Sequence, residues 1–228
     1  MCFSMETENK DLLVEGAKTF GIHLDGKAIE FFEVYLKELL KWNQKINLTA
    51  IRSERGIVLK HFLDSLSVHP YLPEYSSILD IGSGAGFPGI PLKITRPNLE
   101  MTLIDSVRKK VDFQRHIIRM LGLKGIEAIH GRVQDKEILK RLGGRFHVTL
   151  SRAFSDLRTL LILSFPFLEE RGWVIAMRGK VERDEIQLLT ETEGTRYQLQ
   201  KTISLILPLS SFQRTILLFE KGITPPKL

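Results

Sequence analysis

A glycine-rich segment, DIGSGAGFPG at residues 80–89, carries the clearest chemical signal in the chain. It follows an apolar run and precedes a helical pattern, with Pro88 near the first turn, where a missing N–H costs little. Between a strand and a helix at the carboxyl edge of a parallel sheet, such a turn binds nucleotides, because glycine allows close backbone approach. Read from Gly84, the segment matches a dinucleotide fingerprint. Read from Asp80, it matches a different nucleotide loop.

The helix entry separates these two interpretations, since a dinucleotide brings a pyrophosphate. A pyrophosphate needs free N–H groups at the helix N-terminus, and Pro88 and Pro91 remove two of them. Asp80 repels an anion but suits S-adenosylmethionine, which carries a sulfonium and an ammonium. The sequence therefore favours a methyl donor over a hydride carrier.

Two later segments fit the same cofactor. Asp105 ends the run EMTLID, where an acid can accept the ribose hydroxyls or cap the following helix, and the two roles are compatible. The run HGRVQD follows a third strand pattern, and we expect Val133 to pack against the adenine and Gln134 to bond it.

Composition limits the class of protein. The 228 residues, 43% hydrophobic and 26% charged, suit one domain with an elaboration. A net charge of +6 favours an acidic partner such as nucleic acid. Cys2 is the single cysteine, so neither an intramolecular disulfide nor a cysteine-based metal site is expected. We expect a cytoplasmic chain with no metal and no membrane partner, because neither a secretory signal nor a long apolar stretch is present.

The order of patterns predicts an α/β fold. Helical spacing fills the first third of the chain, including 28–42 and a helix that starts at Ser53 and stops before Pro70. From residue 76, five strand patterns alternate with helical ones, among them DLRTLLILSFPFLEERG at 156–172, which indicates a parallel, doubly wound sheet. Runs 202–209 and 214–221 predict an antiparallel pair after a helical stretch near 181–190. We expect disorder in about the first ten residues and in ITPPKL at the end.

With these residues in place, the sequence resembles the bacterial ribosomal RNA small subunit methyltransferase G family, also called glucose-inhibited division protein B (RsmG/GidB). The resemblance extends from about Trp42 to Lys180. It rests on KWNQKINLTAIR, HFLDSL, DIGSGAGFPGIPLKI, LIDSVRKKVDF, the RV of GRVQD, and SRAF. It implies a class I S-adenosylmethionine-dependent methyltransferase: a Rossmann-like, mostly parallel sheet with an antiparallel C-terminal strand. We expect an N-terminal helical cap over residues 1–75 and this domain over 76–228.

The family methylates N7 of a guanine in 16S rRNA. The resemblance adds Arg152 of SRAF and Phe87 to the cofactor contacts, and the sequence departs from the family at Gln134, where Glu is frequent, and at Arg178, where Lys is frequent. The complete set of expected cofactor-binding residues is Gly82, Gly84, Gly86, Phe87, Asp105, Val133, Gln134 and Arg152. We expect no general base, because guanine N7 carries a free lone pair and attack needs only alignment and exclusion of water.

Substrate contacts are expected around the cofactor. The i, i+3 spacing of His61 and Asp64 in HFLDS by itself slightly favours a helix-surface pair, and the resemblance favours a substrate role for them. Arg178 and Lys180 follow the fifth strand at the active edge and can contact RNA phosphates. The expected partner is 16S rRNA or the small subunit, with no DNA, and the chain is expected to be a monomer. A small-molecule methyltransferase of the same fold and a non-catalytic RNA-binding protein remain alternatives.

Overall fold

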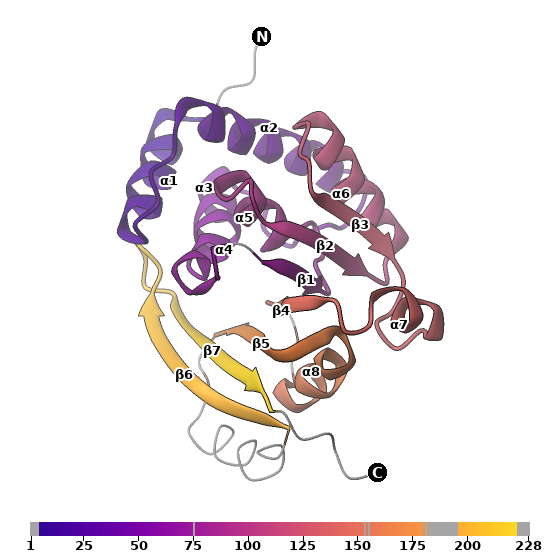
Figure 1. The fold of residues 1–228 in the computed structure, drawn as a ribbon. Coiled ribbons are helices and arrows are strands. Elements are labelled where there is room, and N and C mark those ends of the chain that lie inside the picture. The colour runs from indigo at the N-terminus through magenta and orange to yellow at the C-terminus, as the bar shows by residue number, and fades with distance from the viewer. Residues whose placement is uncertain are drawn as a thin grey trace.

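Seven strands form one mixed sheet with helices on both faces (Figure 1). The computed structural model describes residues 5–74, 76–152, 154, 156–179, 181 and 196–222. The strand order is β3-β2-β1-β4-β5-β7-β6. The strands are β1 (Ser77–Ile81), β2 (Glu100–Asp105), β3 (Ile126–His130), β4 (Phe146–Ser151), β5 (Leu168–Arg178), β6 (Tyr197–Ile206) and β7 (Gln213–Lys221). This architecture confirms the predicted fold class.

The first five strands are parallel, as the alternating patterns predict, and the last two form the predicted antiparallel hairpin. Ile81 of β1 pairs with Ile104 of β2, and Asp105 of β2 pairs with His130 of β3. The carboxyl ends of these strands therefore meet at one edge, where ligands bind in open α/β sheets.

Side chains of each strand alternate between two apolar clusters. Ile78, Met101 and Leu103 face a cluster shared with the N-terminal helices, α5 (Gly89–Thr95) and α6 (Arg108–Met120). On the other face, Leu79 and Ile104 pack with residues of α7 (Lys136–Leu142) and α8 (Leu157–Ser164). The helices of both layers are visible on either side of the sheet in Figure 1.

The N-terminal helices lie over α5 and α6 (Figure 1). They comprise α1 (Thr7–Thr19), α2 (Gly26–Asn43), α3 (Glu54–Ile57), a π-helix (Val58–Leu63), α4 (Asp64–Leu66) and a short 3₁₀ turn (His69–Tyr71). Ser53 caps α3 by accepting from Gly56 N, as predicted. The helix that Ser53 caps is interrupted at Val58 by the π-helix, which the sequence pattern did not predict. The division of the chain at residues 75 and 76 stays a prediction, since one apolar cluster includes residues from both sides of it.

Two local predictions are wrong. Residues 7–10 belong to α1 rather than to a disordered end, because Asn9, Leu12 and Leu13 are buried against the rest of the chain. The helical pattern of DLRTLLILSFPFLEERG ends early, because Leu168 pairs with Phe146 and β5 begins there. The helix expected near 181–190 and the ITPPKL end lie outside the described residues, apart from Val181.

Packing of the N-terminal helices depends on a glycine in α1. A Cβ on Gly16 would overlap the side chain of Leu63, which is fully buried. We predict that Gly16→Ala lowers the free energy of unfolding by about 1–3 kcal/mol, because overpacking outweighs the gain in helix propensity. Gly26→Ala is the control, since a Cβ there meets no atom within 4 Å. Urea unfolding should show a change below about 0.5 kcal/mol for Gly26→Ala, and equal stability of the two variants would contradict the packing.

Candidate active site

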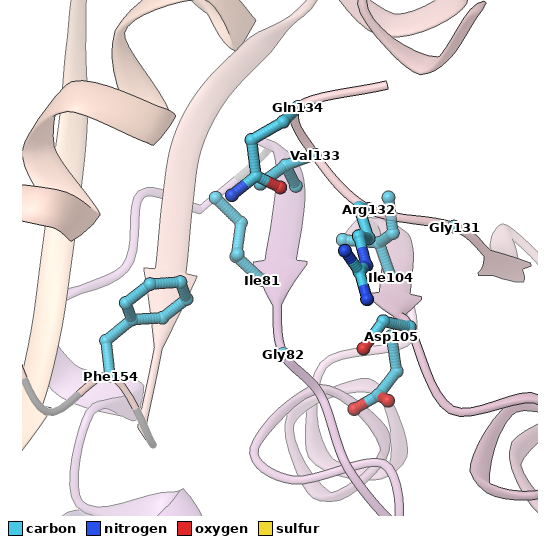
Figure 2. A pocket seen from close by; sticks show the side chains of 10 residues that line it. Ile81, Gly82, Ile104, Asp105, Gly131, Arg132, Val133, Gln134 and Phe154 are labelled. Atoms are coloured by element: carbon cyan, nitrogen blue, oxygen red, sulfur yellow. The ribbon is translucent and has the colours of Figure 1, made fainter.

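A pocket of about 320 Å³ opens at the carboxyl edge of β1, β2 and β3 (Figure 2). Its lining residues are Ile81, Gly82, Ile104, Asp105, Ser106, Gly131, Arg132, Val133, Gln134 and Phe154. In Figure 2, Phe154 lies on one side, Asp105 and Arg132 on the other, and Gly82 between them. The pocket therefore joins an acid, an apolar wall and a glycine backbone at the edge where the sequence predicts the cofactor.

Four predicted cofactor residues line this pocket: Gly82, Asp105, Val133 and Gln134. They come from three different strand ends, which the parallel register brings together. Gly82 has φ of 70°, and the nearest atom to a Cβ built there is Phe154 Cε2 at 3.9 Å. A side chain at position 82 would therefore be strained and would project toward the pocket wall.

The carboxylate of Asp105 serves the loop and the following helix together. Its Oδ2 accepts from Gly84 N at 2.9 Å, and its Oδ1 accepts from Val107 N at 2.8 Å, just before α6. Each carboxylate oxygen can accept a second hydrogen bond, so the capping role leaves capacity for hydroxyl groups in the pocket. The two roles predicted for Asp105 are compatible in this geometry.

Most other N–H groups of the glycine loop are already bonded within the chain. Gly82 N and Ser83 N donate to Ile104 O, and Gly86 N and Phe87 N donate to Ser83 O. At the start of α5, Gly89 N donates to Asp80 Oδ2 and Ile90 N donates to Gly86 O. Pro88 and Pro91 have no N–H to offer. The helix entry therefore presents none of the free donors that a pyrophosphate requires.

Asp80 does not face the pocket, contrary to its expected attraction for a cationic ligand. Its side chain is fully buried behind the glycine loop, and only one of its oxygens has a hydrogen-bond partner among the described residues. Burial raises the pKa of Asp80 to about 7, and the N–H of Gly89 opposes this shift. Asp80 therefore anchors the start of α5 instead of contacting a ligand in the pocket.

The remaining cofactor candidates lie behind the pocket. Gly84 is held by Asp105, and Gly86 packs close to Ile90 and the Tyr35 hydroxyl. Phe87 is buried beneath the N-terminal helices, where its ring stacks on Tyr35 with centroids 5.2 Å apart. These residues shape the loop from its far side, and their contact with a cofactor stays a prediction.

Arg152 points toward the N-terminal helices. Its Nη1 donates to Lys60 O at 3.0 Å, and its Nη2 donates to His61 Nδ1 at 3.0 Å. The same Nη1 lies 3.5 Å from Asp64 Oδ2, and the guanidinium lies over the Phe87 ring, 5.1 Å from its centroid. The structure thus brings three predicted residues, His61, Asp64 and Arg152, into one network that does not line the pocket.

His61 is neutral in this network. Arg152 can only donate, so Nδ1 accepts, and Nε2 carries the proton toward Thr49 Oγ1 at 2.7 Å. The His61 ring stacks on the Phe87 ring, with centroids 4.5 Å apart. Burial, together with the nearby charge of Arg152, lowers the pKa of His61 to about 3.

The C-terminal hairpin joins the network through a residue that the sequence analysis missed. Arg214 of β7 donates from Nε to Asp64 Oδ1 at 2.8 Å. Asp64 and Arg214 are 150 positions apart, and no local pattern marks the pairing. Arg178, at the end of β5, donates to Phe154 O at 3.2 Å, and Lys180 lies outside the described residues.

Arg132 and Ser106 are two further polar lining residues that the sequence analysis did not select. Each directly follows or precedes a selected residue at a strand end, which is the signal that could have identified them. In Figure 2 the Arg132 side chain extends toward Asp105, so a cation and an acid share this side of the pocket.

Comparison with known proteins gives the family. The family model described as rRNA small subunit methyltransferase G matches residues 28–213. The chain belongs to this family. It is 41% identical over 95% of its length to the Ribosomal RNA small subunit methyltransferase G of Geotalea uraniireducens, covering 99% of that protein. It is 40% identical to the relative of the same name in Thermoanaerobacter pseudethanolicus, covering 95% of this chain and 92% of that protein.

Solved structures agree on the fold. A SAM dependent methyltransferase from Aquifex aeolicus superposes with a TM-score of 0.56 at 16% identity, over 72% of this chain and 92% of that chain. M. jannaschii TYW2, solved in complex with AdoMet, gives 0.57 at 16% identity, over 77% and 81%. The fold that the family resemblance implied is therefore confirmed. No helix in the described part of the chain is long and apolar enough to cross a bilayer.

The neutral state of His61 makes stability depend on pH. The pKa of His61 is about 3 in the folded chain and 6.5 when the side chain is free of its neighbours. The His61 side chain therefore binds a proton more strongly in the unfolded chain. The contribution of neutral His61 to the free energy of unfolding is complete above pH 6.5. It is lost as the pH falls toward 3, by about 1.4 kcal/mol per pH unit within that window. We predict that the stability cost of His61→Gln shrinks by about 2 kcal/mol between pH 7.5 and pH 5.0.

Urea unfolding of both proteins at the two pH values measures this difference. His69 and Asp80 also have shifted pKa values, but both are present in the two proteins and cancel to first order. A cost of His61→Gln that is the same at both pH values would show that His61 titrates normally in the folded chain.

Proposed function

We propose that this chain transfers a methyl group from S-adenosylmethionine to N7 of a guanine in 16S rRNA. Membership of the rRNA small subunit methyltransferase G family supports the reaction class and the small-subunit RNA as substrate. The observation within the structure that carries the choice of cofactor is the glycine loop, whose N–H groups at the start of α5 are bonded internally. A diphosphate would find no donors there, whereas a sulfonium needs none.

The lining residues fit an adenosine. The Asp105 carboxylate stands at the end of β2, where it can accept from the ribose hydroxyls. Val133 and Phe154 supply apolar surface for the adenine, and the Gln134 amide can bond its edge. Gly82 allows the methionine part to approach the backbone, since no side chain intervenes. We propose these positions as the cofactor contacts.

The cofactor supplies a methyl group on a positive sulfur, and the chain supplies position. Guanine N7 attacks through its own lone pair, so no residue has to remove a proton. This role fits the pocket, whose lining combines one acid, Asp105, with Arg132, apolar side chains and glycine backbone.

We infer that RNA approaches beside the pocket, where Arg178 at the end of β5 lies 3.2 Å from the backbone of Phe154. The His61, Asp64 and Arg152 network connects this side to the N-terminal helices. We also propose that the protein is a monomer, that it lies in the cytoplasm, and that DNA is not its substrate. The net charge of +6 supports an anionic substrate over a small neutral metabolite.

S-adenosylmethionine with a labelled methyl group tests the proposed reaction. We predict that methyl label passes from S-adenosylmethionine to small-subunit RNA and appears as 7-methylguanosine after digestion. Metabolite fractions offered in parallel should accept no label. Label in metabolites and none in RNA would contradict the proposed substrate.

Two substitutions test the cofactor contacts. We predict that Asp105→Ala and Gly82→Val each lower the methyl transfer rate by about 100-fold or more, because one removes the ribose acceptor and the other strains the loop. Asp112→Ala and Gly122→Val are controls: Asp112 is exposed on α6, and Gly122 has φ of 60° with open space around it. Transfer at the wild-type rate by both site variants would refute the assignment.

A further inference from the structure

Side-chain donors from outside the pocket hold the glycine loop from behind. Gly82, Gly84 and Gly86 all have positive φ, so the loop sequence itself restrains the backbone weakly. Two of its consecutive carbonyl groups, those of Gly84 and Ala85, accept hydrogen bonds from buried side chains on different helices. We propose that the donors, Gln114 and Tyr35, are positioning residues for the cofactor, which rests on the proposed methyl transfer.

Gln114 and Asp105 hold opposite sides of one residue. Gln114 of α6 is fully buried, and its Nε2 donates to Gly84 O at 2.6 Å and to Ser83 Oγ at 2.8 Å. The N–H of Gly84 donates to Asp105 Oδ2 at 2.9 Å. Because the Asp105 side chain lines the pocket, a shift of Gly84 also moves the proposed ribose acceptor.

Tyr35 fixes the next peptide from a different helix on the same face of the sheet. It lies on α2, is fully buried, and its hydroxyl donates to Ala85 O at 2.6 Å. Burial raises the pKa of Tyr35 well above its usual value, so the hydroxyl keeps its proton and remains a donor. A Cβ on Gly86 would lie 2.9 Å from this hydroxyl, so the loop and the tyrosine fit closely. The N-terminal helices thus contribute to the cofactor site without lining it.

These contacts matter because a ligand binds only the fraction of molecules whose site is already formed. Removing either donor leaves a loop carbonyl without its side-chain partner, buried at Ala85 and partly buried at Gly84, and this destabilises the present conformation of the loop. The cofactor must restore that conformation, which lowers its affinity. Binding of the cofactor should therefore weaken, while binding of RNA should not.

The test uses Tyr35→Phe and Gln114→Met, which remove the donors and keep most of the side-chain volume. Calorimetry with S-adenosylhomocysteine should show an affinity about tenfold weaker in each variant. In methyl transfer, the KM for S-adenosylmethionine should rise by a similar factor, and the KM for RNA should stay within about twofold.

Tyr197→Phe is the matched control. Tyr197 is also buried, and its hydroxyl donates to a backbone carbonyl, Leu161 O, at 2.9 Å on the other face of the sheet. This variant should lose stability as Tyr35→Phe does and keep the wild-type affinity. A role in stability alone would therefore give Tyr35→Phe and Tyr197→Phe the same affinity.

The outcomes separate this proposal from the proposed function. Wild-type affinity in both Tyr35→Phe and Gln114→Met, with a wild-type chain that methylates RNA, would overturn the positioning role alone. A wild-type chain that binds S-adenosylhomocysteine and methylates no RNA would overturn the proposed substrate, while weakened binding in the two variants would still support the positioning role.

Discussion

Both oxygens of the Asp105 carboxylate accept backbone hydrogen bonds, one from Gly84 in the loop after β1 and one from Val107 before α6. The parallel pairing of Ile81 with Ile104 brings these two segments together, and the carboxylate then fixes their spacing. A single buried acid thereby couples the glycine loop to the end of the neighbouring strand. Asp105 therefore ties the loop after β1 to the segment before α6, and this link fixes the shape of the pocket.

The N-terminal helices extend this arrangement behind the loop. Tyr35 reaches Ala85, and Phe87 lies between Tyr35 and His61 in a stack of rings. Arg152 after β4 joins the stack and donates to the backbone of Lys60 in the π-helix. Since a π-helix changes which carbonyls its own N–H groups use, this segment suits an outside donor. The helices are therefore part of the framework that holds the glycine loop.

Much of the fold follows from local pattern. Short β-rich runs that alternate with helical patterns predict the strands, and Asp105, Val133 and Gln134 could be selected because strand ends in a parallel sheet share one edge. The long-range pairings could not be selected in this way. The bond between His61 and Arg152 spans 91 positions, and that between Asp64 and Arg214 spans 150. The π-helix was also missed, because its apolar spacing from Val58 to Leu63 resembles that of an α-helix. The strand at Leu168 was missed because pairing with Phe146 overrides a helical sequence.

We propose that an adenosine-bearing methyl donor occupies the pocket between Asp105 and Phe154. A crystal soaked with S-adenosylhomocysteine is the decisive experiment. We expect density with the ribose hydroxyls against the Asp105 carboxylate, the adenine beside Val133, and the amino acid part at Gly82. Density for a dinucleotide with its diphosphate at the start of α5, or a ligand bound away from this edge of the sheet, would contradict it.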